Sequence, residues 1–452
     1  MLPFADHSAG DDQEWIAAGT HEALLTALQQ IGGLRVTSRT SSMQYQRTKL
    51  ALPEIARQLG VGWLVEGSVT RVGERMRITA KLVDGSADQQ IWAGQYETDI
   101  RDILAQQNEV AREIAREVQV VITPEEDLRL ARAQRVDPAA YRAYVRGLHH
   151  FDRVNPADFR RSTELFEEST SLDPKFAPAH AALAAAYGIG VEFGWVAKAE
   201  AAPLAEHALR AVQRIDPGSA SAYRALANVQ FHIRRNLADA EKSYRKAAEL
   251  ESNVYTLFEF GWLLSQCGRH EEAVAVLEEV VALDPRSPLF RCDLGWWCFG
   301  ARNYDRAVEE ALFALELDPS FAEAHWLLAI SYAEQERYEE ALTELELYEV
   351  PSGYSVLWYR GYILALAGRR DEAREALEKL EESGAPDTER AYIFLGLDDR
   401  AGVLEALEQA EGSDIAFQPY LWPRYATYHD DPRFRVVLEK FGLPLPSHGG
   451  SA

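Results

Sequence analysis

An Asp-Pro pair recurs along this chain at a nearly constant spacing. Pro285 and Pro319 are 34 residues apart, and Pro217 lies 68 residues, or twice 34, before Pro285. Proline cannot continue a helix without the loss of a backbone hydrogen bond, so each pair predicts the end of a helix. A fixed period near 34 residues indicates an array of helical repeats in which each unit packs against its neighbours.

The segment between Pro288 and Pro319 shows the content of one unit. Two predicted helices are separated by a turn at residues 300–303, and small residues at Gly295 and Ala307 let the helices approach closely. The two packed faces comprise Leu294, Gly295 and Cys298 in the first helix and Ala307, Ala311 and Ala314 in the second.

This pattern resembles the tetratricopeptide repeat, a helix-turn-helix of 34 residues. Its large and small positions recur over residues 139–410 in about seven to eight units, of which the first two carry insertions. We therefore expect an all-α superhelix in this region. A C-terminal cap and tail are expected over residues 411–452, since a last repeat without a cap would expose its apolar face.

The first 122 residues show a different periodicity, with alternating apolar and polar residues between helical stretches. Turns at Gly73 and at Asp84-Gly85 separate three alternating runs, which predicts a three-stranded antiparallel meander. The predicted strands cover residues 34–38, 63–71, 76–83 and 90–96, and the predicted helices cover 14–31, 52–59 and 100–121.

This region resembles the TolB amino-terminal-like domain, an α/β unit. The stretches that carry the resemblance are LPF, LRVTSRTSSMQYQ, IARQLGVGWLVEGSV, RITAKLVDG and QIWAGQYETDIRDILAQQNEVAREIA. The resemblance covers residues 1–122, and residues 123–138 are expected to be a linker or helix extension. In bacterial proteins this domain commonly precedes tetratricopeptide repeats. That pair often follows a winged-helix regulator, a nucleotide cyclase or a protein kinase. The resemblance implies a regulatory or assembly module, and the family has no known catalytic residues to carry over.

The expected fold class is thus α+β multidomain, with a small α/β domain followed by an all-α tetratricopeptide-repeat superhelix. One feature departs from the resemblance. The first strand would cover only Met1–Phe4, which is shorter than the usual five or six residues. The hypothesis that follows is that the natural chain starts upstream or has lost an upstream effector domain.

The resemblance also implies a binding surface, because the first helix of each tetratricopeptide unit lines the concave side. In that register, four successive units place large aromatic side chains on the side expected to face solvent, and such patches usually mark contact surfaces. Upstream, two polar positions could hold a carboxylate. The predicted groove residues are Tyr255, Phe258, Trp262, Leu289, Trp296, Phe299, Trp326, Ile330, Trp358 and Tyr362, with Arg224 and Asn228 upstream. The alternatives are that the aromatics pack on one another or on the protein's own tail, and that the polar positions are merely solvated.

Composition and motifs exclude several functions. A net charge of −24 argues against nucleic acid and anionic membrane surfaces as partners. No apolar run reaches the length of a membrane-spanning helix, and the N-terminus lacks the pattern of a signal peptide. We therefore expect a cytoplasmic protein, or a periplasmic one if a membrane segment precedes Met1.

The sequence also lacks the common catalytic motifs. It has no phosphate-binding loop, no H-E-x-x-H and no G-x-S-x-G. We expect no enzyme activity, no cofactor and no metal. The leading hypothesis is an interaction scaffold that binds a peptide or protein partner in the concave groove. The alternative is a detached sensory half of a signalling protein that acts in trans on a cyclase, kinase or winged-helix regulator.

Overall fold

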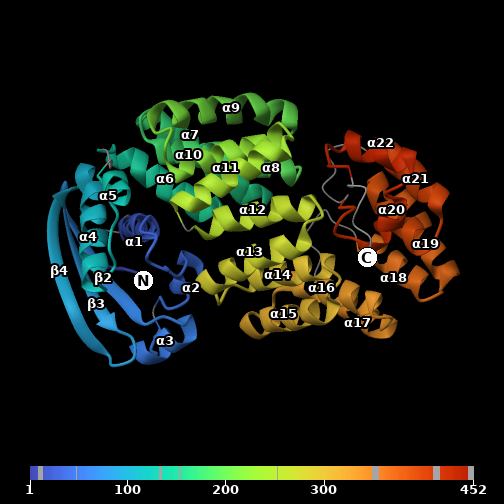
Figure 1. Ribbon diagram of the computed structural model, residues 1–452, viewed down its shortest axis with the longest axis horizontal. Helices are drawn as coiled ribbons and strands as arrows, with labels where there is room; N and C mark the ends of the chain where they lie inside the picture. Colours follow the sequence, from blue (N-terminus) through green and yellow to red (C-terminus); the bar gives the residue numbers. More distant parts are fainter. Residues whose placement is uncertain are drawn as a thin grey trace. The chain divides into compact units, whose positions relative to one another are not determined.

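A computed structural model describes residues 1–8, 14–46, 48–131, 135–151, 153, 155–251, 253–348, 356–410 and 418–445. The chain divides into two compact units. Unit 1 comprises Met1–Glu259 and Ala282–Arg286, and unit 2 comprises Phe260–Val281 and Ser287–Ala452. Helices α12 (Val254–Gln266) and α13 (His270–Leu283), which are labelled in Figure 1, therefore contribute residues to both units.

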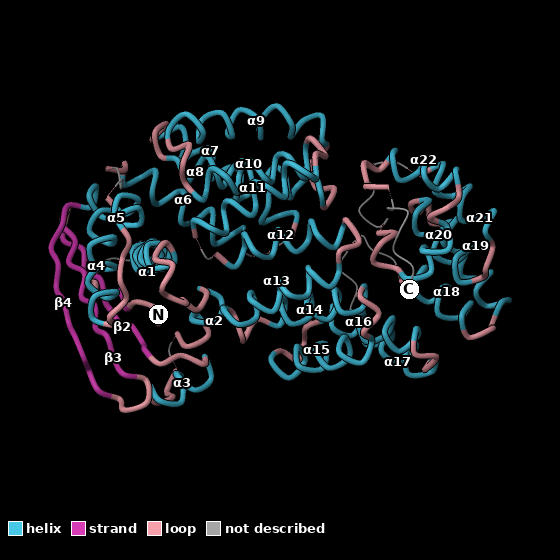
Figure 2. Tube along the Cα trace, viewed as in Figure 1, coloured by secondary structure: helices cyan, strands magenta, loops and turns pink. Residues whose placement is uncertain are grey.

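Unit 1 begins with a small mixed sheet (Figure 2). Its four described strands are β1 (Ala5–Asp6), β2 (Trp63–Val72), β3 (Arg75–Asp84) and β4 (Gln89–Asp99), in that order across the sheet. β2, β3 and β4 pair antiparallel, which confirms the predicted meander, and β1 pairs parallel with β2 at the edge. Gly73 adopts a left-handed φ of 63° in the β2–β3 turn, where glycine costs little.

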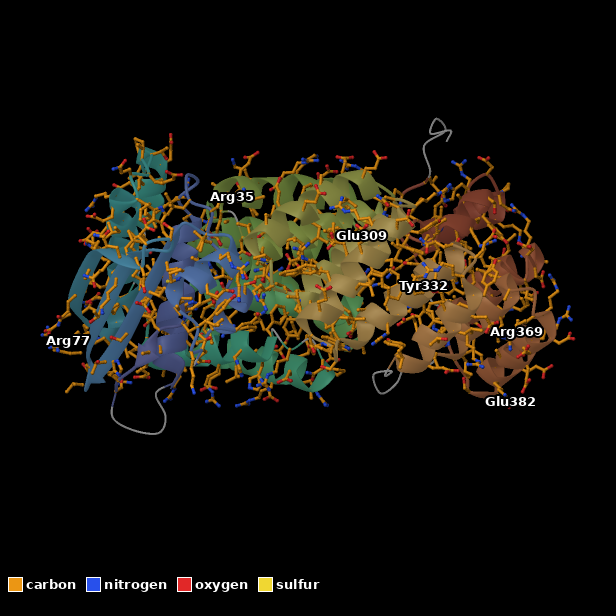
Figure 3. All side chains as sticks on the ribbon, turned by 90° about the horizontal axis from the view of Figure 1, so that it is seen from below. Arg35, Arg77, Glu309, Tyr332, Arg369 and Glu382 are labelled. Atoms are coloured by element: carbon orange, nitrogen blue, oxygen red, sulfur yellow. The ribbon has the colours of Figure 1, made fainter. Side chains whose placement is uncertain are left out.

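Two helices cover one face of this sheet because their apolar faces match the inward residues of the strands. α1 (Glu14–Gln29) contributes Leu24, and α4 (Ile103–Glu117) contributes Val110, to a core that also holds Val69 and Ile78. On the uncovered face, Arg77 projects outward and pairs with Glu97 (Figure 3). Two shorter helices, α3 (Leu52–Leu59) and α5 (Pro124–Leu130), complete the described α/β part.

The structure corrects three predictions for this part. Residues 34–38, predicted as a strand, form no strand and lead instead into a short unpredicted helix, α2 (Arg39–Met43). The first strand lies at Ala5–Asp6 rather than at Met1–Phe4. The helix predicted over 100–121 begins as a 3-10 turn at Ile100–Asp102 and its α-helical part ends at Glu117.

Seven consecutive pairs of helices pack together, as expected of a helical repeat array: α6 with α7, α8 with α9, α10 with α11, α14 with α15, α16 with α17, α18 with α19, and α20 with α21. The helices of unit 1 are α6 (Pro138–Phe151), α7 (Pro156–Leu172), α8 (Ala177–Glu192), α9 (Lys198–Ile215), α10 (Ala220–Asn228), which continues as a π-turn over Val229–Ile233, and α11 (Leu237–Leu250). Those of unit 2 are α14 (Pro288–Gly300), α15 (Tyr304–Leu317), α16 (Ala322–Glu334), α17 (Tyr338–Leu347), α18 (Leu357–Leu366), α19 (Arg370–Glu382), α20 (Asp387–Gly396) and α21 (Arg400–Gln409).

The residues that define the repeat in the sequence have the predicted structural roles. Asp216 and Asp318 are the residues at which α9 and α15 end. A Cβ atom at Gly295 would lie 2.5 Å from the Leu327 side chain and 3.1 Å from the Ala307 carbonyl oxygen, so this position needs glycine for close packing. Charged residues such as Arg369 and Glu382 mark the two ends of α19 (Figure 3).

Beyond α21, the chain forms a 3-10 helix (Pro423–Tyr428) and α22 (Pro432–Lys440). α22 packs on α21 and buries Phe434, Val437 and Leu438, as expected of a cap. The boundaries placed at residues 122 and 138 stay predictions. The boundary at 410/411 borders residues outside the described part of the chain.

Candidate partner-binding surface

The predicted groove residues fall into two sets, one in each unit. Unit 2 holds Trp262 of α12 together with the residues of α14, α16 and α18. Unit 1 holds Arg224 and Asn228 of α10, together with Tyr255 and Phe258 of α12.

Most of the unit 2 set is buried rather than exposed to solvent. Phe299, Ile330 and Tyr362 are fully buried, and Trp296 and Trp358 are only 8% and 6% exposed. The expectation that these side chains face solvent is therefore wrong. Trp262 and Trp326 are half-buried, and Leu289 is 41% exposed.

Residues 418–428, here called the tail segment, bring Trp422 against the buried aromatics of unit 2. The Trp422 ring lies with its centroid 5.9 Å from that of Phe299, 5.9 Å from that of Trp358 and 5.1 Å from that of Tyr362. Trp422 is itself only 3% exposed. The alternative in which the aromatics pack on the protein's own tail is thus what the structure shows.

We define the aromatic face as Trp296, Phe299, Trp358, Tyr362 and Tyr392, which belong to α14, α18 and α20. Its rings contact one another and also the ring of Trp326. Trp358 stacks on Tyr392 at 4.5 Å, and Trp296 lies 4.2 Å from Trp326 of α16. Tyr392 completes the enclosure, with its ring 4.8 Å from that of Trp422. Offset and edge-on ring contacts of this kind stabilise beyond the area that they bury.

Hydrogen bonds and one ion pair fix the tail segment at several points. His270 donates from Nε2 to the Tyr420 carbonyl oxygen at 2.7 Å, and burial lowers the pKa of His270. The Gln418 N–H donates to the Tyr392 hydroxyl oxygen at 3.3 Å. Arg424 lies 3.6 Å from Glu334 of α16. The segment is thus held by its backbone and by charge as well as by Trp422.

Tyr392 and Trp422 were not predicted as site residues. Tyr392 belongs to α20, beyond the four successive units that supplied the predicted aromatic residues. Trp422 lies in a stretch with unusually dense aromatic residues, which include Tyr420, Tyr425 and Tyr428. That density was a usable signal, since a cap needs apolar residues but not so many aromatic rings.

In unit 1, the predicted polar positions already hold a carboxylate of the same chain. Arg224 donates to both oxygens of Glu259, at 2.8 and 3.0 Å, and Asn228 Nδ2 donates to the same carboxylate at 2.8 Å. The Arg224 guanidinium also lies over the Tyr255 ring at 5.7 Å. Glu259 therefore occupies the place expected for a partner's carboxylate.

The described side chains hold neither a metal-binding cluster nor an activated thiol. Within them, no group of three or more His, Cys, Asp and Glu residues could hold a metal ion. Burial raises the pKa of the Cys292 thiol well above its usual value and that of Cys298 to about 11, so both thiols are protonated. Among the described helices, none is long and apolar enough to cross a membrane.

Comparison with known proteins bears on these repeats. Models of the tetratricopeptide repeat match residues 254–287, 292–351 and 355–387. The solved structure of a tetratricopeptide repeat protein from Parabacteroides merdae is similar, with 18% identity, a TM-score of 0.41, and coverage of 57% of this chain and 98% of that one. The matches to the family models confirm tetratricopeptide repeats over residues 254–287, 292–351 and 355–387.

Two curated relatives share part of the sequence. A Rhizobium meliloti protein that carries the name of an adenylate cyclase is 34% identical over 183 residues, which are 40% of this chain and 31% of that protein. A TPR repeat-containing thioredoxin of Arabidopsis thaliana is 30% identical over 100 residues, which are 22% of this chain and 15% of that protein. The chain spans less than a third of the length of either relative.

Proposed function

We propose that this chain, with its tetratricopeptide repeats, is a non-enzymatic interaction scaffold that binds a peptide or protein partner on the aromatic face. In the isolated chain the tail segment occupies that face. A partner would supply an aromatic side chain in place of Trp422 and displace the tail segment.

The observation that supports this proposal is the enclosure of Trp422 by rings from α14, α18 and α20. The tail segment enters as a turn-rich stretch with one inserted tryptophan and a few main-chain hydrogen bonds. Tryptophan anchors in aromatic pockets are the usual source of binding energy at protein interfaces. A surface that holds such a segment within its own chain has the chemistry to hold a similar one from a partner.

A synthetic peptide with residues 418–428 tests the proposal. The peptide is titrated into the Trp422→Ala/Arg424→Ala chain and into the unaltered chain, and binding is measured by fluorescence anisotropy. We expect micromolar binding to the variant and binding at least roughly tenfold weaker to the unaltered chain, whose face is occupied.

The matched control is the same peptide with alanine at the position of Trp422. It should bind neither protein, because the anchor is missing. Equal binding of the original peptide by both proteins would contradict the proposal. So would no binding to a variant that keeps its helicity and cooperative unfolding.

A second candidate function is that of a sensory half that acts in trans on a separate effector. The similarity to the Rhizobium protein named as an adenylate cyclase favours it, as does the resemblance of residues 1–122 to the TolB amino-terminal-like domain. The test uses a signalling effector that is encoded beside this gene and lacks such a region of its own. Addition of the purified chain should change the activity of that effector. If the chain neither changes the effector's activity nor binds it, this candidate function is refuted.

A further inference from the structure

A cavity of about 330 Å³ lies within unit 1, and none of its lining residues belongs to the aromatic face. Its lining includes residues of α1, α2, α4 and α5 of the α/β part and of α6, α8, α9, α10, α11 and α12 of the first repeats. A volume of this size is typical of sites that take small molecules.

One wall of the cavity is apolar. α6 contributes Tyr144, Leu148 and Phe151, and α8 contributes small side chains such as Ala181 and Ala185. The α8 residues that line the cavity are all small and leave space for a ligand: Ala177, Pro178, Ala181, Ala182 and Ala185. This wall suits an aromatic or branched apolar group.

The rest of the lining is polar and includes four guanidinium groups, those of Arg39, Arg129, Arg135 and Arg224. Arg39 pairs with Glu22 at 3.6 Å, Arg135 pairs with Asp102 at 2.7 Å, and Arg224 is held by Glu259. Arg129 of α5 differs from the other three. Its guanidinium donates to the Gln30 carbonyl oxygen at 3.3 Å, and no carboxylate of the described residues lies within ion-pair distance of it.

Three acids line the cavity, Glu22, Asp216 and Glu251, and none of them lies within ion-pair distance of Arg129. Burial raises the pKa of the Glu251 carboxyl to about 7, and one of its oxygens accepts a hydrogen bond from Asn253 at 3.1 Å. The charged groups that act on Glu251 are Arg224 of α10, Arg129 of α5 and Glu22 of α1. The polar wall thus keeps a cationic group without a charge partner of its own.

We propose that this cavity binds a small amphipathic anion. The apolar body of the ligand lies against α6 and α8, and its carboxylate or phosphate accepts hydrogen bonds from Arg129. Guanidinium groups bind such anions through two parallel, charge-assisted hydrogen bonds. This ligand site is independent of partner binding by the aromatic face.

The first experiment tests whether the cavity prefers an anionic head group, with three probes that share an indole ring. Indole-3-acetate, indole-3-ethanol and tryptamine differ in head-group charge and are titrated into the full chain by calorimetry. We expect the acid to bind, and the alcohol and the amine to bind at least roughly tenfold more weakly. Phenyl phosphate against phenylacetate then distinguishes a phosphate from a carboxylate head.

Two variants locate the site. Arg129→Gln should weaken binding of indole-3-acetate roughly tenfold, because it removes one charge-assisted contact. Arg116→Gln on α4, whose side chain is 62% exposed and does not line the cavity, is the matched control and should bind as the unaltered chain does. Ala182→Phe, which fills part of the apolar wall, should also abolish binding while far-ultraviolet circular dichroism stays unchanged.

Preference for tryptamine over indole-3-acetate would overturn the proposal. Unchanged affinity in Arg129→Gln would overturn it too, as would the absence of binding by the acidic probes at millimolar concentration. If Arg129→Gln loses its helical signal in far-ultraviolet circular dichroism, Arg129→Lys is used in its place. That change keeps the charge but loses the bidentate geometry, and it should give intermediate affinity.

Discussion

At the scale of single residues, Trp422 is the residue on which most of this account depends. It lies outside the repeats, yet its ring contacts side chains of three repeat helices. Asp293 of α14 is a second residue of interest, because one of its carboxyl oxygens is buried without a hydrogen-bond partner among the described residues. Substitutions of both residues have predicted effects that can be measured on the purified chain.

Trp422→Ala should destabilise unit 2 by roughly 3–5 kcal/mol, because it leaves a cavity among tightly packed rings. Trp63 on β2 is 44% exposed, so Trp63→Ala is a matched control with an expected cost below about 1 kcal/mol. Denaturant unfolding measures both. Equal costs for the two tryptophans would show that the tail segment does not pack as described.

Asp293→Asn should change how stability depends on pH. Burial raises the pKa of Asp293 to about 8, and the carboxylate of Glu323 acts in the same direction. The folded state thus keeps a proton that the unfolded state loses near pH 4. The contribution of Asp293 to the free energy of unfolding is complete below pH 4 and is lost as the pH rises towards 8.

The variant should therefore gain stability relative to the unaltered chain as the pH rises from 5 to 8, by roughly 1–3 kcal/mol at pH 8 after allowance for solvent screening. Urea unfolding at four pH values in this range measures the effect. Asp371→Asn, at a side chain that is 99% exposed, is the control. If the free energy of unfolding depends on pH in the same way for Asp293→Asn and for the unaltered chain, the prediction is refuted.

At the scale of elements, the sequence predicts those parts that carry local signals. The Asp-Pro pairs predicted where α9 and α15 end, and the turns at Gly73 and Asp84-Gly85 predicted the meander. Residues 34–38 were wrongly predicted as a strand. Their alternation suits a strand, but Ser38 donates its N–H to the Leu283 carbonyl oxygen and begins α2 instead.

That contact could not be predicted, because it joins residues almost 250 positions apart in the chain. Ser41 of α2 donates a hydrogen bond to Asp284, and it accepts one from the Arg286 N–H at 3.1 Å. Asp284 is therefore both a repeat-ending aspartate and a partner of the α/β part. No local pattern distinguishes it from Asp216 or Asp318.

Ser41→Ala should destabilise unit 1 by roughly 1–3 kcal/mol, because it leaves the buried Asp284 carboxylate with one donor fewer. Ser86→Ala is a matched control, since Ser86 donates to Asp84 in an exposed turn at 2.7 Å. Its expected cost is below about 0.5 kcal/mol. Thermal unfolding compares the two, and equal shifts would contradict the described contact.

Gly295→Ala tests the close approach of the helices in one repeat. The added methyl group would overlap the Leu327 side chain, so the expected cost is roughly 1–3 kcal/mol. Gly62→Ala is the control, because a Cβ atom there meets nothing within 4 Å. A neutral Gly295→Ala in urea unfolding would mean that α14 and α16 pack less closely than the structure indicates.

At the scale of the whole molecule, the division into units does not follow the change in sequence pattern near residue 122. Unit 1 combines the α/β part with the first repeats, and the Tyr141 hydroxyl of α6 donates to the Gly19 carbonyl oxygen of α1 at 2.6 Å. Composition and periodicity report local structure, so they could not reveal this combination. They raised the alternative that the chain's own tail packs on the aromatic residues, but they could not decide between it and an open groove.

The central claim is that the tail segment is packed on the aromatic face, and hydrogen exchange read by mass spectrometry tests it most directly. In the unaltered chain, amides of residues 418–428 should exchange slowly, at rates close to those of α18 and α20. In Trp422→Ala they should exchange at least roughly a hundredfold faster, while α14 and α18 keep most of their protection. Exchange of residues 418–428 within seconds in the unaltered chain would contradict the claim.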